Sequence, residues 1–308
     1  LALDEISRRA AEAWERGATE VCLQGGIHPD YTGDTYLSIV RAVKAVAPGM
    51  HIHAFSPLEV SQGAATLGMS VADYLVSLKE AGLGSLPGTA AEILDDEVRA
   101  VLCADKLSTD EWLAVIGTAH EVGLRTTATI MHGHVEHPIH HARHLLRIRD
   151  QQQESGGFTE FVPLPFVHME APIYLKGIAR KGPTFRETVL IHAVARLALN
   201  PVIPNIQTSW VKLGAAGAEE CLKAGVNDLG GTLMNESISR AAGAAHGQEL
   251  SPADIRDLVD ELGRKACQRS TLYGEISAER QVAAEAAKPL TEPVQTPAAK
   301  FAHGVAAE

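Results

Sequence analysis

The residues of this chain that are best placed to do chemistry follow short apolar stretches typical of buried strands. The first stretch, residues 21–23, is followed by Gln24, Gly25 and Gly26. Glycine lacks a Cβ, so a ligand can lie against the backbone of a glycine pair and bond to its N–H and C=O groups. A glycine pair after a strand is more often only a turn. This pair becomes a candidate site because similar groups follow later strands.

Later apolar stretches end in polar or glycine-rich turns of the same kind. Their candidate residues are His53, Ser56 and Glu59; Gly88, Thr89 and Glu92; His132 and His134; His168 and Glu170; Thr208 and Trp210; and Gly230, Gly231, Asn235 and Glu236. In an α/β barrel the carboxyl ends of the strands share one mouth, so these groups would converge there. Taken singly, each has a plainer explanation, since Glu92 and Glu236 could simply favour the start of a helix.

Histidine offers a different chemistry. The chain has 14 histidines, and six of them crowd the stretch 132–144. Positions 137, 141 and 144 share one helix face, but a histidine stripe on an exposed face is usually only solvated, and a metal site needs convergent ligands with supporting partners. A metal-dependent hydrolase on a TIM-type barrel stays open as an alternative from another class. No G-x-S-x-G nucleophile turn and no phosphate-binding P-loop is present.

The pattern of elements predicts how these candidates are positioned. Strand-like stretches cover 21–23, 51–55, 83–86, 125–131, 158–162, 205–209 and 226–229, and helical stretches separate them, including 3–17, 34–46, 109–122, 184–199 and 215–223. About seven alternations of strand and helix indicate a parallel sheet wrapped by helices, and the lack of G-x-G-x-x-G favours a barrel over a dinucleotide-binding sheet. We predict an α/β fold in which residues 1–276 form a (β/α) TIM-type barrel that lacks its first strand.

Composition excludes several classes of partner. The 308 residues are 45% hydrophobic and carry a net charge of −11, with Lys and Arg scattered along the chain. Such a chain is a poor match for nucleic acid or an anionic membrane surface, and no apolar run reaches the roughly 18 residues of a membrane helix. The four cysteines form no close-spaced pair, so we expect a cytoplasmic protein. From about Ser277 the sequence loses periodicity, and residues 277–308 are predicted to be a disordered tail.

Several of these stretches resemble the radical S-adenosylmethionine (SAM) enzymes. They are residues 22–29 (CLQGGIHP), 51–59 (HIHAFSPLE), 86–94 (LPGTAAEIL) and 230–236 (GGTLMNE). The stretch 204–214 (PNIQTSWVKLG) is most similar to the C-terminal half of deazaflavin (FO) synthases. The resemblance runs to about residue 273 and includes the radical SAM enzymes of the menaquinone futalosine pathway, which remain an alternative.

The resemblance implies a transferase of coenzyme F420 biosynthesis. A [4Fe-4S] cluster would bind and cleave SAM, and the resulting 5′-deoxyadenosyl radical would abstract hydrogen from L-tyrosine. The Cα–Cβ bond would then break, and the 4-hydroxybenzyl group would join C5 of 5-amino-6-(D-ribitylamino)uracil. The implied partners are the other FO synthase half, which closes the ring, and an electron donor.

The resemblance also implies roles for individual residues. Those implied for SAM are Gln24, Gly25 and Gly26 at the methionyl group, His53, and Glu92 at the ribose. Those implied for tyrosine and the uracil are Thr208, Trp210, Gly230, Asn235 and Glu236.

One feature departs from the family pattern. The family holds its cluster with a C-x-x-x-C-x-x-C loop after its first strand, and this motif is absent. Thiolate ligands are indispensable to such clusters. We therefore expect no metal ligands in this chain, cluster cysteines upstream of Leu1 in a longer parent protein, and no activity of the chain alone.

Overall fold

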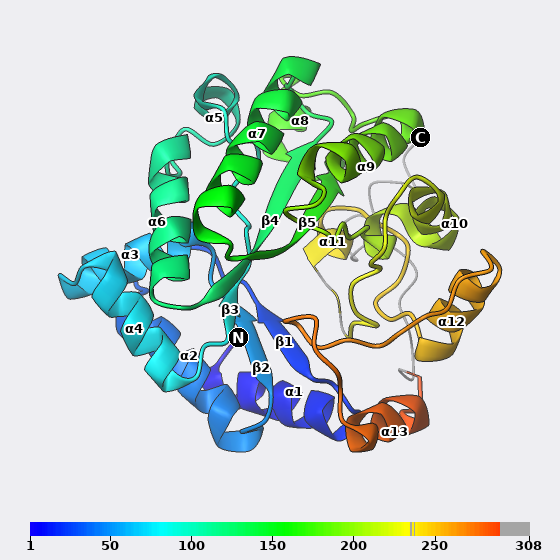
Figure 1. Ribbon diagram of the computed structural model, residues 1–308. Helices are drawn as coiled ribbons and strands as arrows, with labels where there is room; N and C mark the ends of the chain where they lie inside the picture. The colour runs from blue at the N-terminus through cyan, green and yellow to red at the C-terminus, as the bar shows by residue number, and fades with distance from the viewer. Residues whose placement is uncertain (235, 237, 290–308) are drawn as a thin grey trace.

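The computed structural model describes residues 1–234, 236 and 238–289. Its sheet has five parallel strands in the order β1 (Glu20–Leu23), β2 (His51–Ala54), β3 (Ser85–Leu86), β4 (Arg125–His132) and β5 (Phe158–Pro165). Two isolated parallel bridges, Phe161 to Ile206 and Gln207 to Asp228, extend the curl beyond β5. The curved sheet with helices around its outer side is an incomplete (β/α) barrel, as predicted (Figure 1).

Helices of the described part connect the strands. They are α1 (Leu3–Glu15), α2 (Gly33–Val46), α3 (Pro57–Leu67), α4 (Val71–Ala81), α5 (Asp96–Leu102), α6 (Thr109–Glu121), α7 (Pro138–Ser155), α8 (Pro172–Leu175), α9 (Phe185–Leu199), α10 (Trp210–Lys223), α11 (Ile238–Ala241), α12 (Pro252–Asp260) and α13 (Ala278–Ala286). Ser56, Ser108 and Thr184 start α3, α6 and α9 as capping boxes with a glutamate three residues later. None of these helices is long and apolar enough to cross a membrane.

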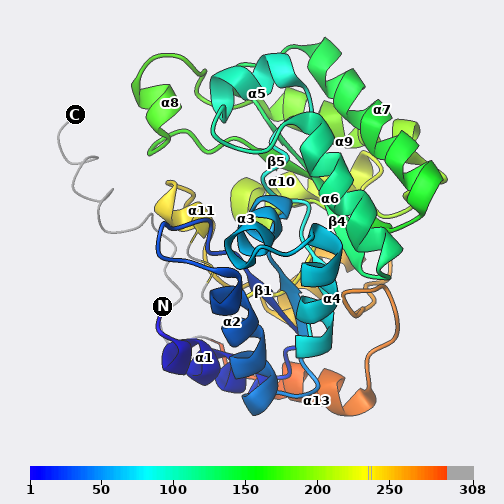
Figure 2. The same ribbon diagram turned by 90° about the vertical axis from the view of Figure 1, so that its left-hand side faces the viewer.

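The helices pack on the sheet through two apolar clusters. One contains Ile52 and Leu75 and joins β2 to α2, α3 and α4, which cover the β1 side of the molecule in Figure 2. The other contains Ile130 and Phe161 and joins β4 and β5 to α6, α7, α9 and α10. Successive side chains of a strand point to opposite faces, so the interior face of the barrel is left to the residues between these apolar positions.

The predicted strands and helices agree best with the structure in the first half of the chain. The stretches expected at 205–209 and 226–229 contribute only the two isolated bridges rather than full strands. Helix α10 begins at Trp210, and Gly214 breaks it with φ 69° and ψ 175°, so the helix expected at 215–223 is its second part.

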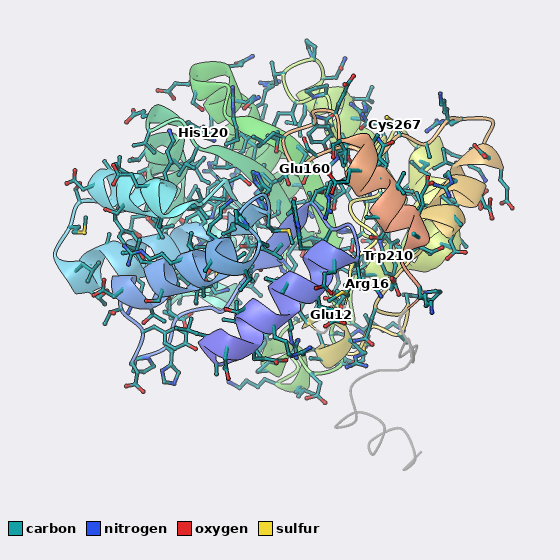
Figure 3. The ribbon with its side chains drawn as sticks, turned by 90° about the horizontal axis from the view of Figure 1, so that it is seen from below. Glu12, Arg16, His120, Glu160, Trp210 and Cys267 are labelled. Carbon is teal, nitrogen blue, oxygen red and sulfur yellow. The ribbon has the colours of Figure 1, made fainter. Side chains whose placement is uncertain are left out.

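The segment after Ser277 differs from the expected disordered tail. Residues 278–286 form α13, whose Arg280 donates to the Trp14 carbonyl at 2.6 Å and stacks its guanidinium 4.1 Å from the Trp14 ring. Figure 3 shows α13 lying beside α1. Alanine and glutamate favour helix in this stretch, and contact with a distant aromatic ring holds it. Residues 290–308 of the expected tail lie outside the described residues.

A short segment before this helix, residues 269–273, forms hydrogen bonds with three separate parts of the barrel. Arg269 donates to Asp228 at 2.5 Å and to Glu160 on β5 at 3.1 Å. The Tyr273 hydroxyl donates to the same Glu160 oxygen at 2.6 Å, and Thr271 donates to Glu20 on β1. The segment therefore links β1, β5 and the last bridge, which no strand connects directly.

Candidate active site

The glycine turn after β1 is held by one buried carboxylate. Oε1 of Glu59 accepts the N–H groups of Gly25 and Gly26, both at 3.0 Å. Oε2 accepts the Ser56 N–H at 2.7 Å and its hydroxyl at 2.8 Å, and Glu59 is only 2% exposed. The capping box that starts α3 thus also fixes the neighbouring turn, because one carboxylate accepts from both.

The backbone of this turn faces open space. A Cβ on Gly25 would meet only Glu59 Oε1, at 3.9 Å, and one on Gly26, whose φ is 68°, would meet nothing within 4 Å. The Gln24 amide beside them reaches Cys22 Sγ at 3.6 Å and is exposed. The turn therefore leaves room for a ligand against its backbone.

The interior face below the turn is polar. His53 is buried, and its Nδ1 lies 2.7 Å from Ser85 Oγ, which also lies 2.7 Å from His51 Nε2. Burial lowers the pKa of His53 to about 4, so its imidazole is neutral near pH 7. Cys22 pairs in register with His53, and its side chain is exposed.

The turn after β3 is tightly constrained. The Gly88 N–H donates to Thr127 Oγ1 at 2.9 Å, and a Cβ there would lie 2.2 Å from the Thr127 carbonyl oxygen, so only glycine fits. Ala90 and Glu92 take left-handed backbone conformations with φ of 59° and 48°. Such strain concentrates at functional sites. Glu92 pairs with Lys106 Nζ at 2.7 Å, so any contact with the SAM ribose would include this lysine.

The histidine-rich stretch after β4 does not converge on one point. Glu136 is buried and accepts from the backbone of Gly133 at 2.5 Å and of His134 at 2.8 Å, and it lies 3.1 Å from His141 Nε2. Among the described residues, the only group of His, Cys, Asp and Glu able to hold a metal ion is Asp95, Glu97 and His140, which contains one histidine. The stretch is therefore organised around a carboxylate, and the geometry does not favour the metal-hydrolase alternative.

The last two strand positions bring further candidates to the same edge. Thr208 is fully buried, and its N–H donates to the Asp228 carbonyl at 2.9 Å. Trp210 is buried in the cluster around α9 and α10, and its indole N–H donates to the Gly231 carbonyl at 3.0 Å. Gly230 has φ 73° and donates to Asp228 Oδ1 at 2.7 Å. Their contact with substrate stays a prediction.

The final candidates lie in the loop before α11. Oε1 of Glu236 accepts the Ser239 N–H at 2.9 Å, as a helix-start carboxylate does, while its Oε2 is buried without a partner in the described part. Asn235 lies outside the described residues. His168, after β5, packs its ring 4.6 Å from that of Tyr174. The sequence reasoning did not single out Lys106 or Lys212, and spacing alone carries no signal for either.

Comparison with known proteins identifies the family. The radical SAM superfamily matches residues 1–147, and the CofH/MqnC C-terminal region matches residues 155–282. The 5-amino-6-(D-ribitylamino)uracil–L-tyrosine 4-hydroxyphenyl transferase of Methanopyrus kandleri is 53% identical over 88% of this chain and 73% of its own length. The chain belongs to this family of radical SAM enzymes.

Longer relatives and a solved structure are consistent with this family and its fold. The FO synthase of Streptomyces avermitilis is 56% identical over 93% of the chain, and that of Mycobacterium leprae is 53% identical over 89%. The chain spans about a third of these proteins, 33% and 32% of their lengths. The crystal structure of methylornithine synthase superposes with a TM-score of 0.63 at 21% identity, covering 87% of this chain and 74% of that one, which supports the fold.

The two cofactors of radical SAM enzymes fit this chain unequally. The open turn at Gly25 and Gly26 leaves room for the methionyl end of SAM, while Glu59 accepts both of its N–H groups and the Tyr36 hydroxyl donates to the Gly26 carbonyl at 3.1 Å. The cysteines do not fit a four-iron cluster, since the sequence has no C-x-x-x-C-x-x-C motif and the metal-capable group of the described part contains no cysteine. Cys103, at the end of α5, and Cys221, in α10, are buried, whereas Cys22 and Cys267 are exposed.

Proposed function

We propose that this chain is the barrel that binds SAM and the two substrates for the coupling of L-tyrosine to 5-amino-6-(D-ribitylamino)uracil. The observation that carries the proposal is the 53% identity to the Methanopyrus kandleri transferase over 73% of its length. The match of residues 155–282 to the CofH/MqnC C-terminal region adds support in the second half of the chain. The proposed place is the cytoplasm.

In this proposal residues at the carboxyl ends of the first three strands bind SAM. Gly25 and Gly26 present backbone to the methionyl group, with Glu59 holding their N–H groups away from it. Gln24 and the neutral His53 line the interior beside the turn, and Glu92 with Lys106 faces the ribose. Bound to a reduced four-iron cluster, SAM supplies the 5′-deoxyadenosyl radical in this family, and we place the cluster ligands outside this chain.

Residues after the sixth and seventh strand positions bind the two substrates in this proposal. Thr208 and Trp210 shape the wall after the sixth strand position, and Gly230, Asn235 and Glu236 follow the seventh. The coupling breaks the Cα–Cβ bond of tyrosine and joins the released 4-hydroxybenzyl carbon to C5 of the uracil. Because FO synthases are about three times as long as the matched region, we also propose the other synthase half and an electron donor as partners.

An anaerobic coupling assay tests the proposal. The natural full-length protein that contains this chain is reconstituted with iron and sulfide, reduced, and given SAM with both substrates. Mass spectrometry should detect a product that contains the 4-hydroxybenzyl and ribityl-uracil parts, together with 5′-deoxyadenosine. Turnover of a menaquinone-pathway precursor in place of these substrates would instead support the futalosine-pathway alternative and end this proposal.

A further inference from the structure

A lysine near the start of α10 points to a part of the site not assigned above. Lys212 lies in the first turn of α10, where its N–H donates to the Ser209 carbonyl at 3.1 Å. Its Nζ donates to the hydroxyl of Ser239, in α11, at 3.1 Å. Ser239 is buried. The ammonium group therefore reaches from the sixth strand position to the loop that follows the seventh.

Glu236 stands on the other side of the same serine. Its Oε1 accepts the backbone N–H of Ser239 at 2.9 Å, and its Oε2 is buried with no hydrogen-bond partner among the described residues. Burial lowers the pKa of Lys212, and the charge of Glu236 opposes that shift. The two charges are thus close enough to interact, but the ammonium bonds to Ser239 rather than to the carboxylate.

Ser239 sets the spacing between these charges. Its hydroxyl accepts from the lysine at 3.1 Å and its backbone N–H donates to the glutamate at 2.9 Å, so the two charged groups bond to different atoms of one residue. The Trp210 indole N–H on the Gly231 carbonyl, at 3.0 Å, fastens the start of α10 to the loop that carries Glu236. The arrangement is a positive donor and a negative acceptor held apart at the candidate site.

Keeping the charges of Lys212 and Glu236 out of direct contact costs free energy when no ligand is bound. A buried ammonium needs a counter-charge, and a buried carboxylate oxygen needs a donor. The head group of an α-amino acid carries a carboxylate and an ammonium on one carbon and would supply both. A neutral uracil ring could offer a carbonyl acceptor and an N–H donor, but it carries no charge to match either Lys212 or Glu236. The chemistry therefore favours an amino-acid head group.

We propose that Lys212 binds the α-carboxylate, and Glu236 the α-ammonium group, of the substrate L-tyrosine. This inference rests on the proposed function. The methionyl end of SAM has the same head-group chemistry, but the open glycine turn after β1 already suits it. The role for Glu236 replaces the pairing with the uracil that its position alone would suggest.

Analogue binding to the reconstituted full-length protein, with SAM present, provides the test. Tyramine lacks the carboxylate of tyrosine, and 3-(4-hydroxyphenyl)propionate lacks its ammonium. The wild-type protein should bind both more weakly than tyrosine. Lys212→Met should raise the Kd of tyrosine roughly 10- to 100-fold, the loss of one charge-assisted bond, with little change for tyramine. Glu236→Gln should do the same for tyrosine but spare the propionate.

A matched control lies on the same helix. Lys223 is exposed and paired with Glu219 and Glu220, so Lys223→Met removes the same charge away from the candidate site. It should leave the Kd of tyrosine unchanged. Thermal melting of each variant separates loss of binding from loss of fold, and the wild-type analogue comparison stands without any variant.

The outcomes separate this inference from the proposed function. Equal affinity of the wild-type protein for tyrosine and tyramine would overturn the inference, even if the coupled product forms. A raised Kd for SAM in Lys212→Met, with tyrosine unchanged, would assign the head-group site to SAM and also overturn it. Selective loss of tyrosine binding would support it. Failure of the wild-type protein to form coupled product is a failure of the proposed function instead.

Discussion

Glu59 gives the sharpest prediction about how the site is built. Its carboxylate accepts four hydrogen bonds while only 2% exposed, two from the glycine turn and two from Ser56. Glu59→Gln keeps one oxygen for the turn but places an NH₂ group against the Ser56 N–H, so a donor faces a donor. Losing a buried charge-assisted bond and leaving that donor unpaired should cost about 2–4 kcal/mol of unfolding free energy. For a chain of this size that lowers Tm by roughly 3–6 °C.

The control for this change is another capping box in the same chain. Glu111 is exposed and accepts from the Ser108 N–H at 2.8 Å and its hydroxyl at 2.9 Å, and both of these bonds stay within its own capping box. Glu111→Gln should therefore lower Tm much less than Glu59→Gln. Differential scanning calorimetry of both variants checks the comparison. Equal small losses would show that Glu59 is only a local cap and refute its role as the anchor of the turn.

Three further predictions follow from the site and the barrel interior. Gly25→Val in the full-length protein should abolish SAM binding while the fold persists, because a branched side chain would fill the space beside the turn; unchanged SAM affinity would contradict this. Burial, then the charge of Asp228, raises the pKa of Glu160 to about 7. Since that lies above the unfolded value of about 4.3, its stabilising contribution is present below that value and is lost as pH rises to about 7; Glu160→Gln should flatten this slope in urea titrations. Reconstitution of this chain alone should leave it without stoichiometric iron and sulfide, and a bound four-iron cluster would show the cysteine reasoning to be wrong.

The first five strands could be predicted because each is a short apolar run that ends at glycine, proline or a polar turn. The glycine turn after β1 was found for the same reason. The role of Glu59 as the anchor of this turn was harder to predict. Ser56 and Glu59 signal a helix start in the sequence but give no sign of a contact 33 or 34 residues away. Long-range partners of a carboxylate depend on tertiary packing, which local pattern does not encode.

The second half of the barrel was less predictable. Residues 205–209 look like a strand, yet pairing is limited to isolated bridges at Ile206 and Gln207. A shift of one residue moves every side chain to the other face. Spacing therefore could not tell that Gln207 contacts Glu160 while Thr208 is buried, nor that helix α13 would be held by Trp14, a residue 266 positions away.

Isotope transfer from tyrosine tests the central claim most directly. The full-length protein is given SAM, 5-amino-6-(D-ribitylamino)uracil and tyrosine labelled with ¹³C at either Cβ or Cα. A transferase of the proposed kind moves the 4-hydroxybenzyl carbon to the uracil, so the Cβ label should appear in the coupled product and the Cα label should not. Retention of both labels in one product, or a product with neither, would contradict the proposed coupling.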